Sequence, residues 1–249
     1  MGLLDIFSKE RTRERNASRA LNKYAQSPDR MKALQSLASD GSPEALYALL
    51  RRFGMLYDKT IDDEQEKEWV FETLVAKGGE VLDPLKKYLL SADSISWPLR
   101  LLDKIVATKD EVVDVIAYVM SRHEPGYERD PTKKIQLLNH LADIKKARVA
   151  ALVAPYLADM DEGVRYAAAE ALLRQEDESA ASGPLLDVFA SDAEESKRLR
   201  IRIADGFAQL GWTVAADKRA AVEKHLPETF QIEARGKEPA RIVKKQTKG

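Results

Sequence analysis

The stretch Met160–Gln175, MDEGVRYAAAEALLRQ, decides the fold. It opens with an acidic turn, in which the Asp161 side chain can accept hydrogen bonds from the backbone N–H groups at the start of a helix. Val164, Ala167 and Ala171 then follow at steps of three and four residues, which is the spacing of one helix face. Small residues on that face let a neighbouring helix approach closely. The stretch therefore predicts an amphipathic helix packed tightly against other helices.

The same apolar spacing recurs along the chain. Triplets with steps of three and four residues begin at Met31, Leu99, Ile135, Val164 and Ile201. The first and last begin 170 positions apart, and a degenerate repeat around residues 69–71 brings the mean period to about 34 residues. A period in this range with two helices per repeat predicts an α-solenoid.

A basic side chain follows the first residue of most triplets. Four of the five triplets have one, and the side chains at this position are Lys32, Arg100, Gln136, Arg165 and Arg202. Two roles are open: a structural ladder that bonds the acidic turn of the same or the adjacent repeat, or a surface that faces a ligand. We expect the ladder, because an array of repeats needs contacts that set its register.

Met160–Gln175 resembles the HEAT-like repeats of the bilin-lyase type, in which an acidic turn precedes Val-Arg and an alanine-rich helix. Residues 200–212, RIRIADGFAQLGW, are similar more loosely. The Trp/Leu-Gly/Tyr pattern of tetratricopeptide repeats is absent. The resemblance implies an all-α fold of helix pairs. We predict about six pairs, at residues 17–53, 62–91, 96–122, 131–159, 161–190 and 193–225.

The predicted solenoid of residues 17–225 is flanked by two segments of different character. Residues 1–16 form an amphipathic N-terminal segment with a polar linker, and residues 226–249 form a basic C-terminal segment. In the latter, Phe230, Ile232 and Ala234 alternate with polar residues before a turn at residues 236–239. The alternatives there are a small hairpin on the last repeat and a basic tail.

Composition excludes several classes of chemistry. The 249 residues hold 40 Lys and Arg against 41 Asp and Glu, so no general attraction to phosphate exists and we expect no nucleic-acid partner. Cysteine is absent, which excludes disulfides, thiolate nucleophiles and cysteine metal sites. We find no secretory signal and no apolar stretch near the roughly 20 residues of a membrane span. We therefore expect a cytoplasmic protein.

No catalytic motif stands out. His123, His140 and His225 each lack a second ligand at helical spacing, so we expect no metal and no cofactor. Deoxyhypusine hydroxylase, an iron enzyme among the repeat families of this type, uses several His-Glu pairs, whereas this chain has His123-Glu124 alone. Phosphate-binding glycine loops, nucleophile elbows and kinase signatures are missing. These absences predict that the chain is not an enzyme.

Two further HEAT-like families supply the alternative function. The alkylpurine DNA glycosylase stacks damaged DNA on tryptophans in a basic groove, but Trp69, Trp97 and Trp212 stand beside apolar neighbours and are expected to be packing residues. The bilin lyase is supported by about one repeat. The alternative is therefore an enzyme or a nucleic-acid-binding protein on the same scaffold.

The N-terminal segment has three candidate roles. As a helix, it would project Leu3, Leu4, Ile6 and Phe7 on one side, and residues 9–19 add a net charge of +3. It could fold back as a cap on the first repeat. It could instead contact an anionic membrane, placing the protein peripherally at the inner face of the membrane. The third role is docking into the groove of a partner protein.

These observations favour a non-catalytic adaptor or scaffold that binds a partner protein on the concave face of a HEAT-like solenoid. We expect the second helix of each pair to line that face. The predicted binding residues are Arg51, Arg52, Lys86, Lys87 and Arg148. A continuous basic groove with an exposed Trp would instead favour DNA, and a surface of mixed charge would favour protein.

Overall fold

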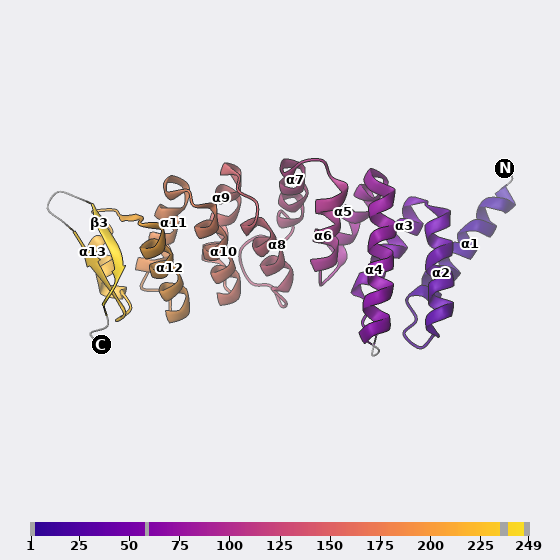
Figure 1. Ribbon diagram of the computed structural model, residues 1–249, viewed down its shortest axis with the longest axis horizontal. Coiled ribbons are helices and arrows are strands. Elements are labelled where there is room, and N and C mark those ends of the chain that lie inside the picture. Colours follow the sequence, from indigo (N-terminus) through magenta and orange to yellow (C-terminus); the bar gives the residue numbers. More distant parts are fainter. Residues whose placement is uncertain (1–2, 58–59, 235–238, 247–249) are drawn as a thin grey trace. The chain divides into compact units, whose positions relative to one another are not determined.

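The computed structural model describes the backbone of residues 3–57, 60–234 and 239–246, and the side chains from Ser8 onward within these ranges. The fold is all-α, an α-solenoid of HEAT-like helix pairs with a small C-terminal sheet, as the apolar periodicity predicts (Figure 1). The chain divides into two compact units, residues 1–122 and 123–249.

The first unit holds three helix pairs preceded by one further helix. Its helices are α1 (Leu3–Ala20), α2 (Ser27–Asp40), α3 (Pro43–Leu50), α4 (Thr60–Lys77), α5 (Leu82–Ser91), α6 (Ser96–Ile105) and α7 (Lys109–Met120). The short 3-10 helices η1 (Arg51–Gly54) and η2 (Gly78–Val81) follow α3 and α4. The first helices of the pairs, α2, α4 and α6, pack in one layer, and the second helices, α3, α5 and α7, pack in the other.

The second unit repeats this two-layer arrangement. Its helices are α8 (Thr132–Ala142), α9 (Ala147–Val153), η3 (Ala154–Ala158), α10 (Glu162–Gln175), α11 (Glu178–Ala190), α12 (Lys197–Leu210) and α13 (Arg219–His225). Helix α10 packs between α8 and α12, while α11 packs against α9, η3 and α13. Ala167, Ala168 and Ala171 are buried in this unit, as their small size predicts.

A capping hydrogen bond and a close contact between helices shape α10 and α12. Asp161 caps α10 by accepting a hydrogen bond from the backbone N–H of Val164 at 3.0 Å. On α12, a Cβ atom at Gly206 would lie 2.5 Å from Cδ2 of Leu173, so only glycine lets the two helices approach this closely.

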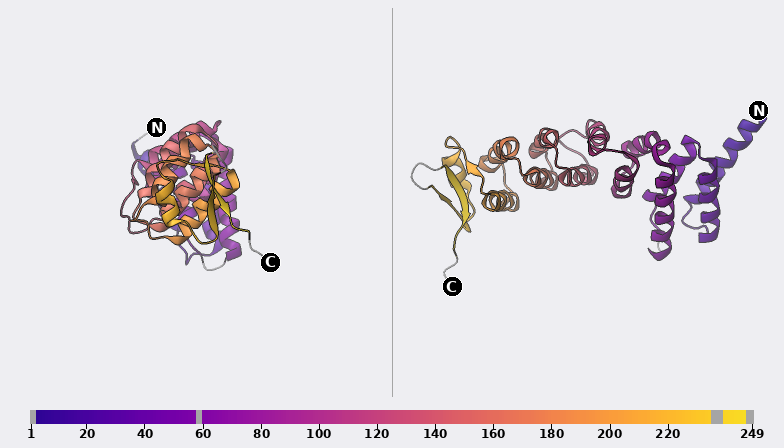
Figure 2. Two further views of the ribbon diagram at one scale, coloured as in Figure 1. Left: turned by 90° about the vertical axis from the view of Figure 1, so that its left-hand side faces the viewer. Right: turned by 45° about the horizontal axis from the view of Figure 1, so that its top comes forward.

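The C-terminal segment forms the hairpin, which was one of its two predicted alternatives, and this hairpin pairs with a short strand that directly follows α12. Strands β1 (Thr213–Val214), β2 (Phe230–Glu233) and β3 (Ala240–Lys244) form an antiparallel sheet in the order β1-β3-β2. Figure 2 shows β2 and β3 side by side at this end of the chain. The predicted turn at residues 236–239 lies almost wholly outside the described residues. Because residues 240–244 are paired as a strand, the alternative of a basic tail does not hold for them.

Helix α1 packs on α2, and Asn16 donates a hydrogen bond to the Ser36 hydroxyl at 2.8 Å. The side chains of Leu3, Leu4, Ile6 and Phe7, for which three roles are predicted, lie outside the described residues. Among the helices that the structure describes, none combines the length and the apolarity needed to cross a bilayer.

Candidate ligand-binding surface

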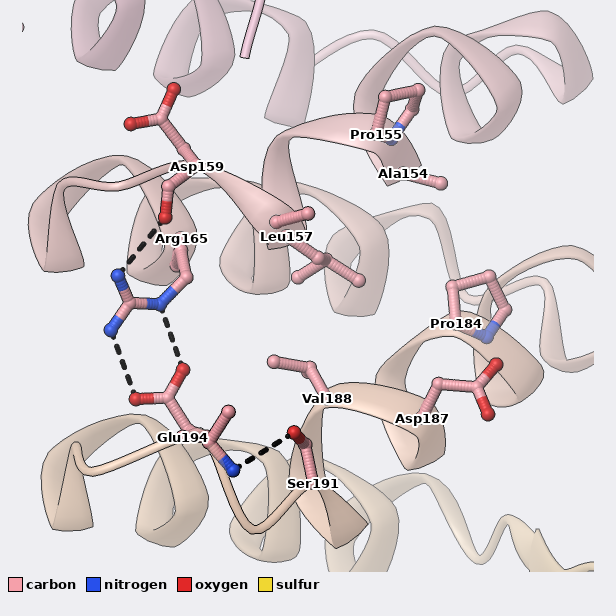
Figure 3. A pocket seen from close by; sticks show the side chains of 12 residues that line it. Ala154, Pro155, Leu157, Asp159, Arg165, Pro184, Asp187, Val188, Ser191 and Glu194 are labelled. Carbon is pink, nitrogen blue, oxygen red and sulfur yellow. Dashed lines mark hydrogen bonds and ion pairs between the residues drawn. The ribbon is translucent and has the colours of Figure 1, made fainter. Parts of the chain in front are cut away.

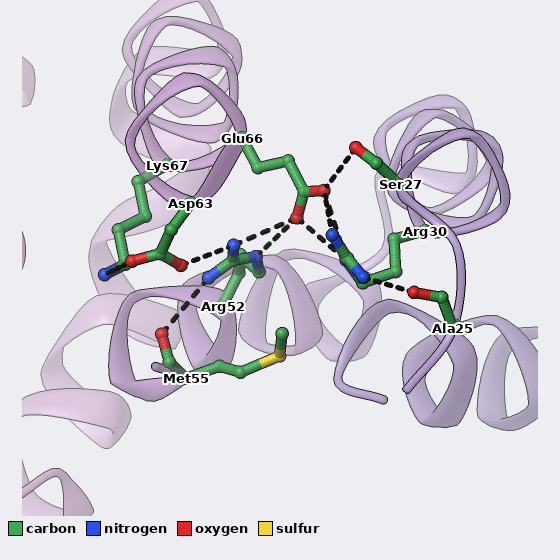
Figure 4. A network of polar contacts seen from close by, with 8 residues as sticks. All are labelled: Ala25, Ser27, Arg30, Arg52, Met55, Asp63, Glu66 and Lys67. Atoms are coloured by element: carbon green, nitrogen blue, oxygen red, sulfur yellow. Dashed lines mark hydrogen bonds and ion pairs between the residues drawn. The ribbon is translucent and has the colours of Figure 1, made fainter. Parts of the chain in front are cut away.

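A buried network of charged side chains links three elements of the first unit (Figure 4). Glu66 on α4 accepts hydrogen bonds from Arg30 on α2 at 2.8 Å and from Arg52 in η1 at 3.0 Å. Arg52 also donates to Asp63 at 2.7 Å, and the Lys67 ammonium lies 2.5 Å from the other oxygen of Asp63. These five side chains are almost completely buried. They hold α2, α4 and η1 together and carry a net charge of +1.

The network corrects the predicted role of Arg52. The sequence places this residue on the partner-binding face, but its side chain is 0% exposed. Its guanidinium is used by Glu66, Asp63 and the backbone carbonyl of Met55. Arg52 is therefore a structural residue of the first unit.

Buried carboxylates in both units make the free energy of unfolding depend on pH in acidic solution. Burial acts to raise the pKa of Glu66, but hydrogen bonds from Arg30 and Arg52 lower it below its usual value of 4.5. In the second unit, burial likewise opposes hydrogen bonds from Lys134, and the pKa of Asp159 is lowered. The folded chain therefore binds fewer protons than the unfolded chain near pH 4 and below.

We expect the free energy of unfolding to be constant above about pH 5 and to fall as the pH drops through 4.5 and below. The reason is that protons bind the unfolded carboxylates before they bind Glu66 and Asp159 in the fold. Urea unfolding followed by circular dichroism at pH 7, 5, 4 and 3 measures this dependence. An unfolding free energy that stays level from pH 7 to pH 3 would contradict it.

A ladder of ion pairs joins neighbouring repeats of the second unit. Arg165 forms two hydrogen bonds with Glu194, at 2.7 and 2.9 Å, which confirms the ladder role predicted for this side chain (Figure 3). Lys134 contacts Asp159, in the turn that leads into the next repeat, at 2.8 Å in the same way. Each carboxylate also accepts a hydrogen bond from the backbone N–H two residues further on, at the start of α10 or α12. The ladder thus fixes each helix start to the repeat before it.

Other basic positions of the repeat pattern behave differently. Arg202 pairs with Glu170 on α10, the first helix of the preceding pair, and the Arg100 guanidinium lies 4.4 Å from the ring centroid of Trp97. In the first unit, Arg13 lies 3.5 Å from Asp40, whose other oxygen accepts a hydrogen bond from the N–H of Ser42. This contact has the geometry of the ladder, although Arg13 falls outside the triplets that predicted it.

The second unit has a hollow of about 560 Å³ between η3 and α11 (Figure 3). Ala154, Pro155 and Pro184 form part of its apolar wall. The charged side chains that line it already have partners. These pairs are Arg165–Glu194, Asp187–Lys218 and Asp159–Lys134. A pocket needs polar groups that can turn to a ligand, so this hollow is the weaker candidate.

The first unit has a grooved face across the second-helix layer. A hollow of about 680 Å³ lies beside α3, η1 and α5, and Lys67 of α4 and Trp97 of α6 also line it. A second hollow of about 240 Å³ lies between α3 and α5, and a third of about 550 Å³ lies between α5 and α7. Tyr47 lines the first two, and Asp83 and Lys87 line the last two. The three hollows therefore adjoin one another, and we call them together the α3–α5–α7 groove.

Both aromatic rings and cations line this groove. The Lys87 ammonium lies 4.8 Å from the ring centroid of Tyr47, and Tyr118, at the far end, is 46% exposed. Trp97 is half-buried and stacks on Phe53 with ring centroids 5.6 Å apart. Its packing role is thus present, and one side of the ring also borders the largest hollow. Arg51 is exposed and makes no ion pair with a described carboxylate.

The structure brings together three of the five predicted binding residues. Arg51, Lys86 and Lys87 line the groove, whereas Arg52 is buried and Arg148 is exposed on α9 of the second unit. The apolar and charge patterns of the sequence did not predict the tyrosines of the groove. The spacing of four residues from Tyr47 to Arg51 was the available signal, since it places both on one helix face.

The three histidines are absent from the lining of the groove and of the hollow in the second unit. The His123 Nδ1 atom is 2.9 Å from Glu128, and the His225 Nε2 atom is 2.8 Å from Asp192. Within the described ranges, no three His, Asp or Glu side chains are grouped as metal ligands.

No protein-family model matches this chain, and no curated protein matches its sequence. A solved structure of human deoxyhypusine hydroxylase in complex with glycerol aligns with 90% of this chain and 92% of its own, with 14% identity and a TM-score of 0.32. That protein is an enzyme, and this finding contradicts the prediction of a non-catalytic adaptor and the prediction that the chain is not an enzyme. A likeness at this level assigns no activity to the present chain.

Proposed function

We propose that the protein recognises a segment of polypeptide in the α3–α5–α7 groove. The observation that carries the proposal is the row of three adjoining hollows across three consecutive second helices. Half-buried Tyr and Trp rings beside an exposed Arg give the groove the residue types that dominate binding energy at protein interfaces. A row of separate hollows suits successive side chains of one bound chain.

The charge of the groove supports a polypeptide over a nucleic acid. Its described lining includes four cations and four carboxylates, namely Arg51, Lys67, Lys86 and Lys87 with Glu44, Asp83, Asp93 and Asp114. A strand of phosphates needs a surplus of cations, because neutralising phosphates is what drives such binding. Mixed charge instead sets the register and orientation of a chain that carries both signs.

The proposal concerns binding and gives no residue a catalytic role. We also propose that the repeats are related to HEAT-like repeats of the bilin-lyase type. The Asp161 cap and the Arg165 ladder of the second unit support this relation. Membrane or partner contact by the N-terminal apolar side chains stays a prediction.

Selection of random 12-residue peptides displayed on phage, with the intact chain as bait, tests the proposal. Peptides that are enriched are then measured by fluorescence anisotropy against variants. We expect Tyr47→Ala to weaken their binding by about thirtyfold, because an aromatic anchor in an interface contributes about 2 kcal/mol.

Tyr166→Ala is the matched control for this experiment. Tyr166 lies on α10 of the second unit with the Arg198 guanidinium 3.9 Å from its ring centroid, much as Lys87 lies over Tyr47. The Tyr166→Ala variant should bind the peptides with unchanged affinity. Absence of enriched peptides, or equal losses in the two variants at equal melting temperatures, would contradict the proposal.

A further inference from the structure

We infer that the largest hollow of the groove is a subsite for an oxyanion, a carboxylate or a phosphate carried by the bound segment. This inference extends the proposed function. It rests on the proposed function only for the identity of the molecule that carries the anion. The hollow is lined in part by Tyr47, Arg51, Lys67, Tyr88 and Trp97.

The buried network supplies the first argument. It contains three cations, Arg30, Arg52 and Lys67, but two carboxylates, so one positive charge is not balanced within it. Lys67 is the member that also lines the hollow. Its ammonium has three N–H donors, and its contact with Asp63 uses one of them. An ammonium buried to this degree gains from an anion within reach, because little water is present to screen it.

Arg51 supplies the second argument. It lines the same hollow, is exposed, and makes no ion pair with a described carboxylate. A guanidinium presents a planar fork of N–H donors that fits a carboxylate or a phosphate through two parallel hydrogen bonds. Asp93 is the acidic side chain among the described lining residues, so the hollow holds two cations against one carboxylate.

The aromatic wall makes the subsite selective for an anion that is attached to an apolar or aromatic group. Tyr88 is buried beside the hollow, and Trp97 stacks on Phe53 at its edge. Burial raises the pKa of Tyr88 to about 12, with a further contribution from Tyr47, so its hydroxyl keeps its proton at neutral pH. Rings of this kind exclude water from an ion pair and favour a ligand with a ring of its own.

Methionine methyl groups provide a direct probe. Met55 lines the hollow, whereas Met160 is exposed in the second unit. The intact chain labelled with ¹³C at the methionine methyl groups is titrated with phenyl phosphate, phenylacetate and neutral benzyl alcohol while its carbon–proton NMR spectrum is recorded. We expect both anions to shift the Met55 signal at concentrations at least tenfold lower than benzyl alcohol, and to leave Met160 unmoved.

Arg51 lies outside the buried network, and Arg51→Gln keeps a long polar side chain, so we expect this variant to fold. We expect this variant to bind both anions at least tenfold more weakly and to bind benzyl alcohol with unchanged affinity. Tighter binding of phenyl phosphate would identify a phosphorylated residue as the source of the anion, and tighter binding of phenylacetate an acidic side chain or a C-terminus. Equal affinity for the alcohol and the anions, or no shift of Met55, would overturn the inference. Peptide binding that persists in that case would leave the proposed function intact.

Discussion

Replacing Glu66 by alanine is expected to lower the free energy of unfolding by about 3–5 kcal/mol. The carboxylate accepts hydrogen bonds from Arg30 and Arg52, and both guanidinium side chains are 0% exposed. Without Glu66, Arg30 loses its carboxylate partner. Arg52 keeps Asp63 as its carboxylate partner, and Asp63 also pairs with Lys67. Removing one partner from a buried pair costs more than the pair contributes, because a buried charge is left without compensation.

Urea unfolding at pH 7, followed by far-ultraviolet circular dichroism, measures this loss. Glu64→Ala is the matched control, since Glu64 lies on the same helix with its side chain exposed. We expect a change of about 0.5 kcal/mol or less in the control. A loss of less than about 1 kcal/mol in the Glu66 variant would show that the network does not hold the first unit together.

Replacing Lys134 by methionine is expected to destabilise the second unit by a similar amount, about 3–5 kcal/mol. Methionine keeps the length and packing of the side chain but removes the ammonium. Asp159, whose side chain is 1% exposed, would then keep its backbone hydrogen bonds and lose its cation. Its pKa would rise, because the hydrogen bond from Lys134 is what most opposes the effect of burial.

The matched control is Lys145→Met, which removes the cation of a surface pair. Lys145 lies 2.9 Å from Glu176, with side chains 60% and 58% exposed. A solvated pair of this kind contributes about 0–1 kcal/mol. Thermal and urea unfolding should therefore separate the two variants clearly, and equal losses would mean that the ladder has no special structural role.

The fold follows from sequence because its determinants are local. Steps of three and four residues mark a helix face within a single segment, and their recurrence marks the repeat. The Arg165 ladder was predictable for the same reason, since the acidic turn is itself part of the repeat. The hairpin was visible from alternation, but β1 was not, because a strand of two residues has no pattern.

Arg52 shows where local reasoning fails. Helical periodicity assigns a face only while the helix continues, and Arg52 lies in the 3-10 turn η1 after α3 has ended. Its partner Glu66 is 14 residues away on another helix. A charged side chain is normally expected at the surface, so nothing in the sequence marked it as buried.

The groove could be predicted only in part for a related reason. Lys86 and Lys87 were identified because they carry charge on a second helix, and Arg51 because it carries charge directly after one. The hollows themselves depend on the spacing of three helices and on the depth at which their tyrosines lie. Those distances arise from packing between repeats, which the sequence pattern does not specify.

Hydrogen–deuterium exchange of the intact chain, with and without a peptide obtained by the phage selection, shows directly whether the peptide lies in the α3–α5–α7 groove. We expect slower exchange in α3, α5 and α7, including residues 47–50, 86–90 and 114–118, with no change in η3 and α11. Slower exchange confined to η3 and α11, or no change in the three groove helices at saturating peptide, would contradict this placement of the peptide.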